Sequence, residues 1–144
     1  MKKTVFAFVL LLIVCGLTQA QSNKIVTAKQ VNGTWHYKNN EIKILALGGG
    51  KLKVQFDLSY VYKNQYGPTA NVGFALGEAD IDGIIAIFTT TDFGECKITM
   101  KFTGGKLVVT QEGSDADCGF GHNVTADGTY KKVSGAKPKF DEDR

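Results

Sequence analysis

Residues suited to catalysis are few in this chain. Histidine, the usual general base near neutral pH, occurs only at His36 and His122. A nucleophilic site needs such a base within reach of a nucleophile and an orienting acid, and the sequence holds no Gly-x-Ser-x-Gly elbow. The sequence therefore predicts a protein that is not an enzyme, with no catalytic residue and no cofactor.

One loop combines metal-binding residue types. His122 follows Asp115 and Asp117 within a segment that is rich in glycine. Imidazole and carboxylate groups together can ligate a metal ion. The commoner outcome for such residues is a solvated polar loop, and we predict no metal site here.

A second acidic group lies on a predicted strand. Glu78, Asp80 and Asp82 alternate along the chain, so their carboxylates point to the same face. Carboxylates that flank a glycosidic bond can hydrolyse it, and carboxylates can bind calcium, although an EF-hand loop needs further ligands that are missing here. We favour the simpler interpretation, a solvated outer face.

Residues Met1 to Ala20 have the pattern of an export signal. Lys2 and Lys3 precede an unbroken apolar run that is too short to span a bilayer, and Ala20 offers a small residue for cleavage. Lipidation of Cys15 is the alternative, but Val14 is a poor residue before a lipidated cysteine. We predict an exported protein, periplasmic or secreted, with no stable membrane insertion after cleavage.

Removal of the signal leaves an almost neutral chain. Two of the 17 basic residues lie in the signal, so 15 remain against 14 acidic residues, a net charge of +1. Nucleic-acid binding needs a basic patch or stripe, and we predict no nucleic-acid partner. About 124 residues remain, which is enough for one domain with one core.

Cys96 and Cys118 are the only cysteines of the predicted mature chain. In an exported protein an even count favours a disulfide. The sequence predicts this bridge, with two free thiols as the alternative. The bridge would fix one end of the glycine-rich segment Gly113 to Asn123, in which Phe120 lies between Gly119 and Gly121.

Residues 51–62 form the clearest predicted strand. Every second side chain is apolar and the intervening ones are mostly polar, the pattern of a strand with one buried face. The apolar set is Leu52, Val54, Phe56, Leu58, Tyr60 and Tyr62.

Strand and turn signals divide the rest of the chain regularly. Residues 63–69 are predicted as a loop, Gly77 as a break, and Gly83 as a bulge or a sharp bend within a strand. The eight predicted strands are 33–38, 41–47, 51–62, 70–76, 79–88, 95–102, 106–111 and 124–132.

Eight strands with short connections predict an all-β, antiparallel, up-and-down barrel. In a closed barrel the first strand, with Gly33-Thr34-Trp35, lies beside the last, with Gly128-Thr129-Tyr130. A two-sheet sandwich is the alternative. We predict a single barrel domain over residues 21–132 and a disordered tail over 133–144.

The Gly-Thr-Trp opening and the eight-strand layout resemble the lipocalin and avidin-type barrels, called calycins. The run Cys118-Gly119-Phe120-Gly121, followed by Gly128-Thr129-Tyr130-Lys131, is similar to small exported bacterial proteins, some related to lysozyme-inhibitor-like modules. The resemblance implies the architecture but assigns no binding residue.

Five aromatic residues are the candidate ligand- or partner-binding residues: Trp35, Tyr37, Tyr60, Tyr62 and Phe120. Tyrosine and tryptophan rings can line a cavity with polar groups at hand, or they can fill a small barrel. Phe120 is either a presented anchor for a partner or a plug in one end of the barrel.

We therefore predict a non-catalytic binding module that contacts another protein through the disulfide-fixed loop 113–123. One alternative is a carrier of a small, partly apolar ligand, with a cavity among Trp35, Phe56, Tyr60 and Phe74. Another is an inhibitor of a cell-wall hydrolase. A net charge of +1 is less acidic than expected for an inhibitor of a strongly basic enzyme.

Overall fold

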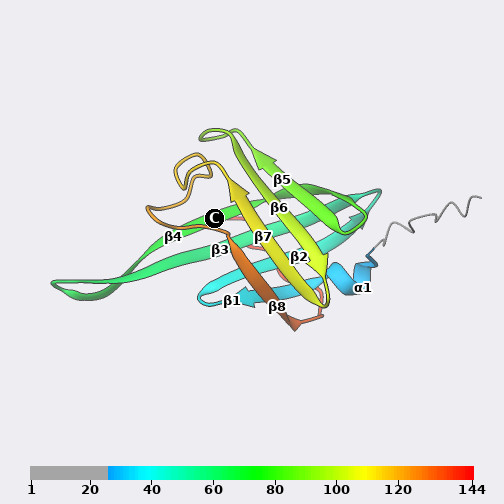
Figure 1. Ribbon diagram of the computed structural model, residues 1–144, viewed down its shortest axis with the longest axis horizontal. Coiled ribbons are helices and arrows are strands. Elements are labelled where there is room, and N and C mark those ends of the chain that lie inside the picture. Colours follow the sequence, from blue (N-terminus) through cyan, green and yellow to red (C-terminus); the bar gives the residue numbers. More distant parts are fainter. Residues whose placement is uncertain (1–25) are drawn as a thin grey trace, which may run out of the picture.

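The computed structural model describes residues 26–144 as a closed antiparallel barrel, in which β1 pairs with β8 (Figure 1). This confirms the predicted all-β barrel. The predicted signal and Cys15 lie outside the described residues. The elements are α1 (Ala28–Val31), β1 (Gly33–Tyr37), β2 (Asn40–Gly48), β3 (Lys51–Asn64), β4 (Gly67–Asp82), β5 (Ile85–Thr90), β6 (Cys96–Thr103), β7 (Lys106–Glu112) and β8 (Gly128–Ser134).

The barrel interior is filled with side chains. The inward residues of β3, from Leu52 to Leu58, are buried as the alternation predicts, and Phe56 packs edge-on against Phe88 of β5 with ring centroids 5.2 Å apart. Tyr60 and Tyr62, the last members of the same apolar set, are exposed because β3 continues beyond the barrel.

β4 supplies the smallest residues of the barrel wall. Val72, Phe74 and Leu76 share a face as predicted, but Gly73 and Ala79 of the opposite set are the buried ones. A Cβ atom added at Gly77 would lie 3.0 Å from the Phe88 ring. Large side chains from other strands therefore occupy the space that β4 leaves free.

The predicted boundary between the fourth and fifth strands is wrong. Gly77 does not break the chain, because β4 continues through it to Asp82. Gly83, with φ of +59°, lies instead in the turn before β5. Gly83 can adopt this left-handed conformation without a Cβ clash.

The end of the barrel beneath α1 is closed by side chains. The indole N–H of Trp35 donates a hydrogen bond of 3.0 Å to the carbonyl of Val31, the last residue of α1. The Trp35 ring packs edge-on against Phe102, with centroids 5.9 Å apart. Both side chains are buried.

The carboxyl-terminal segment differs from the predicted disordered tail. β8 includes residues 133 and 134, and the following segment lies against the outer face of β2 and β3. Gln55 points outward yet is fully buried, because its amide exchanges hydrogen bonds with the backbone N–H and the carboxylate of Asp141. Lys43–Asp141 and Asp57–Arg144 ion pairs surround this contact.

Within residues 26–144, the structure contains no helix of the length and hydrophobicity that a membrane crossing requires.

Candidate functional site

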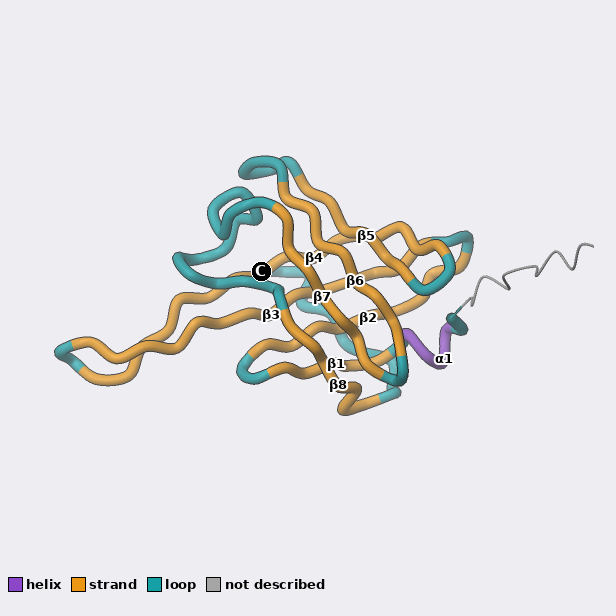
Figure 2. The backbone as a smooth tube through the Cα atoms, viewed as in Figure 1, coloured by secondary structure: helices purple, strands orange, loops and turns teal. Residues whose placement is uncertain are grey.

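The longest hairpin of the barrel extends far beyond it. β3 and β4 pair without a break from Lys51↔Asp80 to Asn64↔Gly67, whereas β2 pairs with β3 only as far as Glu41↔Asp57. Residues 60–71 therefore form a projecting two-stranded element, which we call the arm (Figures 1 and 2). The predicted loop 63–69 is wrong, because strand pairing continues to a two-residue turn at Gln65 and Tyr66.

The arm carries several exposed apolar side chains. Tyr66 at its tip is 89% exposed, and the rings of Tyr60 and Tyr62 stack with centroids 6.0 Å apart. Val61 is also exposed, and Lys63 is the only charged residue of the arm. A two-stranded hairpin alone is marginally stable, and exposed apolar patches of this kind mark interaction surfaces.

The loop between β7 and β8 holds the base of the arm. The Gly121 N–H donates to the carbonyl of Val72 over 2.9 Å, and the Asn71 side-chain amide donates to the carbonyl of His122 over 2.7 Å. The loop is joined to β6 by the predicted Cys96–Cys118 disulfide, whose Cα atoms lie 4.9 Å apart. The disulfide thus limits the movement of the arm at its base.

Phe120 is the plug of this end of the barrel. Its side chain is 6% exposed, and a Cβ atom added at Gly73 of β4 would lie 2.7 Å from its ring. Phe120 therefore presents no free ring face to a partner.

Two carboxylates of the loop order its backbone. Asp115 accepts hydrogen bonds from the N–H groups of Asn123 (2.6 Å) and Ala116 (2.8 Å), and these hold the pKa of its carboxyl below the ordinary 3.8. Hydrogen bonds from the Ser114 hydroxyl and N–H likewise lower the pKa of Asp117. His122, in the same loop, lies 3.6 Å from Asp115. The contacts of Asp115 and Asp117 are therefore made within the loop itself.

The Glu78, Asp80 and Asp82 carboxylates are exposed on the outer face of β4. Asp80 pairs with Lys51 at 2.5 Å, and this hydrogen bond raises the pKa of Lys51 above its ordinary value. His36 lies 2.5 Å from Glu41 on the neighbouring strand. Lys51–Asp80 and His36–Glu41 are thus exposed cross-strand pairs on the barrel wall.

The five aromatic candidates do not converge on one site. Trp35 lies at the α1 end of the barrel, and Tyr37 packs against Tyr130 with centroids 5.6 Å apart. Burial raises the pKa of Tyr130 to about 12. Tyr60 and Tyr62 lie on the arm, and Phe120 is buried in the barrel.

The cavity predicted among Trp35, Phe56, Tyr60 and Phe74 is not formed. Trp35 and Phe56 are buried within the core, whereas Tyr60 lies on the arm. Phe74 points outward, beneath the guanidinium of Arg144.

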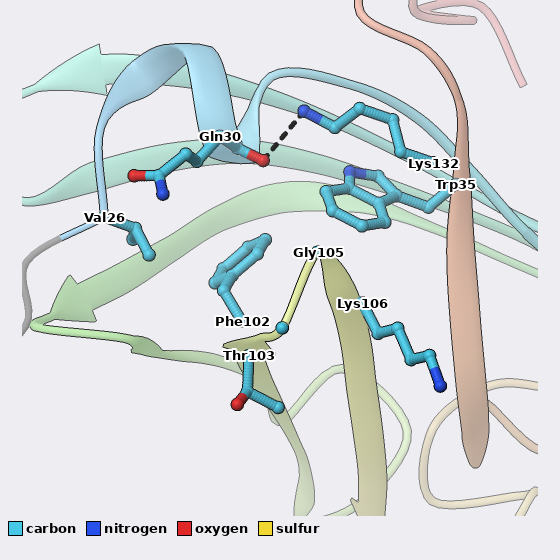
Figure 3. A pocket seen from close by; sticks show the side chains of 9 residues that line it. Val26, Gln30, Trp35, Phe102, Thr103, Gly105, Lys106 and Lys132 are labelled. Atoms are coloured by element: carbon cyan, nitrogen blue, oxygen red, sulfur yellow. Dashed lines mark hydrogen bonds between the residues drawn. The ribbon is translucent and has the colours of Figure 1, made fainter.

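A shallow pocket of about 290 Å³ lies beside α1, with Trp35 and Phe102 at its floor (Figure 3). Val26, Gln30 and the turn Gly104-Gly105 complete its wall. The Lys132 ammonium lies 4.8 Å from the centre of the Trp35 ring and donates to the carbonyls of Lys29 and Gln30. Partial burial lowers the pKa of Lys132.

Interpretation of the sequence missed the arm. Its signal is the absence of Asp and Glu between Ser59 and Val72, a stretch that holds three tyrosines. The sequence instead predicts the end of the long strand 51–62, a loop over 63–69 and the start of the strand 70–76, because alternation identifies only strands with one solvated face.

Comparison with protein-family models, with curated proteins and with solved structures finds no match to this chain.

Proposed function

We propose that this chain is an exported, non-catalytic binding module that contacts another protein through the arm. The observation that carries the proposal is the projecting hairpin of residues 60–71, which exposes three tyrosines and a valine, carries one charged residue and is anchored at its base. Tyrosines on a rigid support are typical of binding hot spots, because a large area is buried with little loss of side-chain entropy.

The sequence predicts loop 113–123 as the contact with a partner, whereas we propose the arm as the main contact. Phe120, which the sequence offers as either an anchor or a plug, is buried. The backbone of the loop is engaged with Asn71 and Val72. The exposed side chain of His122 lies beside the base of the arm and can extend the same surface.

Site-specific photocrosslinking in the native cell envelope tests the arm. A photoreactive phenylalanine analogue at Tyr66 is expected to give one discrete polypeptide adduct. The same analogue at Lys131, which is exposed on β8, is the matched control and should give none. Replacement of Tyr60 and Tyr62 by Ser should remove the Tyr66 adduct. Equal adducts from both positions, or none from Tyr66, would refute the proposal.

A second candidate function is the carriage of a small apolar ligand, in the pocket beside α1 instead of the barrel interior. The observation that favours it is the buried Trp35–Phe102 floor of that pocket. A volume of about 290 Å³ lies at the lower end of the usual range for ligand pockets.

Trp35 is the single tryptophan of the chain, so its fluorescence reports binding at this pocket directly. Titration with the neutral probe N-phenyl-1-naphthylamine should quench Trp35 and saturate. Val26→Phe, which fills the pocket mouth, should abolish the quenching, and Val133→Phe at an exposed position of β8 should not. No quenching in the unchanged protein would exclude this function for ligands of that class.

A further inference from the structure

β4 and β5 pair over only part of their lengths. Their register covers Ala79↔Phe88 to Asp82↔Ile85, and no pairing between them extends beyond Ala79 in residues 26–144. At the other end, Gly121 of the loop bonds to Val72. The edge of β4 from Gly73 to Gly77 thus carries no neighbouring strand among the residues that the structure describes.

The backbone groups of this edge point into the gap. Along a strand, successive residues direct their N–H and C=O groups to opposite neighbours. The carbonyl of Val72 faces the loop, and the β3–β4 register contains no bulge. Phe74 and Leu76, two and four residues further on, therefore direct their N–H and C=O groups toward the gap.

The gap is a groove of about 430 Å³. Phe88 lies at its floor and is buried, whereas Phe93 is exposed at the rim. Phe120 and Phe88 fill the barrel behind it, so the groove opens only outward. Its lining residues are Phe74, Ala75, Leu76, Phe88, Thr90, Asp92, Phe93, Cys118, Glu142 and Arg144.

The charges around the groove favour a cationic occupant. Glu142 pairs with Lys53, and Arg144 pairs with Asp57. Asp92 lines the groove, is exposed, and forms no ion pair with any residue in the described range 26–144. The unneutralised charge at the groove is therefore negative.

We propose that this groove binds an extended segment of another polypeptide, which adds as a strand to the β4 edge and carries lysine or arginine beside apolar side chains. Strand addition satisfies the open N–H and C=O groups of Phe74 and Leu76. The apolar side chains pack beside Phe74, Leu76 and Phe93. The proposal is independent of the arm, because it rests on a different edge and a different set of residues.

The test uses a blocked pentapeptide of lysine, valine, threonine, valine and lysine as the probe. Titration into the isotopically labelled mature protein, followed by NMR, should shift and saturate the amide signals of Phe74 and Leu76. The hydrogen exchange of these two amides should slow. A peptide methylated on its central backbone nitrogen, which cannot complete the strand pairing, should bind about tenfold more weakly.

Proline substitution tests whether the peptide binds at the free edge of β4. Leu76→Pro removes one N–H that faces the groove, and proline is tolerated at a free strand edge. It should weaken peptide binding about tenfold. Ala70→Pro makes the same change at an edge position of the arm and should leave peptide binding unchanged. Equal effects of the two prolines would overturn the proposal.

A charge reversal tests the groove without altering the backbone. Asp92→Lys should weaken binding of the cationic peptide several-fold. Glu95→Lys is the matched control at an exposed carboxylate outside the groove. If the peptide shifts only amides of residues 60–71, or none, the groove proposal fails. If the Tyr66 crosslink is absent but the peptide still binds the groove, only the proposal for the arm is refuted.

Discussion

Gly73 is a position at which the barrel wall has no room for a side chain. A Cβ atom there would lie 2.7 Å from the Phe120 ring and 2.9 Å from Val124. We expect Gly73→Ala to lower the free energy of unfolding by about 1–3 kcal/mol, because the plug must shift. Urea denaturation of the mature protein measures the loss.

The matched control is Gly135→Ala. A Cβ atom there would meet nothing within 4 Å, so the free energy of unfolding should stay within about 0.5 kcal/mol of the unchanged protein. A similar value for the two variants would mean that Phe120 does not pack against β4.

Gln55 holds the carboxyl-terminal segment to the barrel. Its amide is fully buried and bonds to Asp141 through both its oxygen and its nitrogen. Gln55→Ala should release residues 136–144, seen as rapid proteolysis of the tail while the melting temperature of the barrel changes little. Lys106→Ala, on the far side of the barrel, is the control. A tail that stays protected in Gln55→Ala would contradict this role.

At the scale of the elements, the disulfide-fixed loop 113–123 holds the base of the arm. Replacement of Cys96 and Cys118 by Ala should destabilise the protein by about 3 kcal/mol, the chain-entropy value for a loop of this length. It should also speed hydrogen exchange in the arm more than in β6 and β7. An unchanged melt in protein purified without reductant would contradict the first expectation, and an arm that exchanges as before would contradict the second.

The loop and the tail should also respond to acid. The pKa values of Asp115, Asp117 and Asp141 are lowered by hydrogen bonds, chiefly from Asn123, Ser114 and Gln55 respectively. A carboxyl with a lowered folded-state pKa stabilises the fold above its ordinary pKa of 3.8, and this contribution is lost as the pH falls through the folded value.

Amide exchange of the loop and of the tail should therefore increase below about pH 3.8, before the barrel unfolds. Asp115→Asn should make the loop exchange faster at neutral pH and reduce its acid response. NMR between pH 6 and pH 2 follows both segments. A loop that loosens only together with the barrel would contradict the assigned role of Asp115.

At the scale of the whole molecule, strand periodicity predicts most of the barrel. It gives the strand count, the antiparallel order, the closure of β1 on β8 and the inward set of β3. Two cysteines in a predicted exported chain give the disulfide. These features follow from local alternation and from residue counts, which one sequence contains.

The features that sequence reasoning missed depend on contacts between distant segments. The alternation predicts a solvated face for Gln55, but Asp141 of the tail, 86 residues further along the chain, covers it. Gly77 was interpreted as a break, because its small size matters only against the Phe88 ring. The arm was missed because its faces lie beyond the barrel, where neither is buried.

The central claim is that the arm, and not the barrel, makes the contact with another protein. The most direct measurement replaces residues 61–70 by Asn-Gly, which keeps the Tyr60↔Asn71 register and suits a two-residue hairpin turn. Native mass spectrometry then compares protein recovered from the cell envelope with and without the arm. We predict a polypeptide adduct on the unchanged protein and a bare, fully folded barrel for the shortened one. The same adduct on both proteins would contradict the claim.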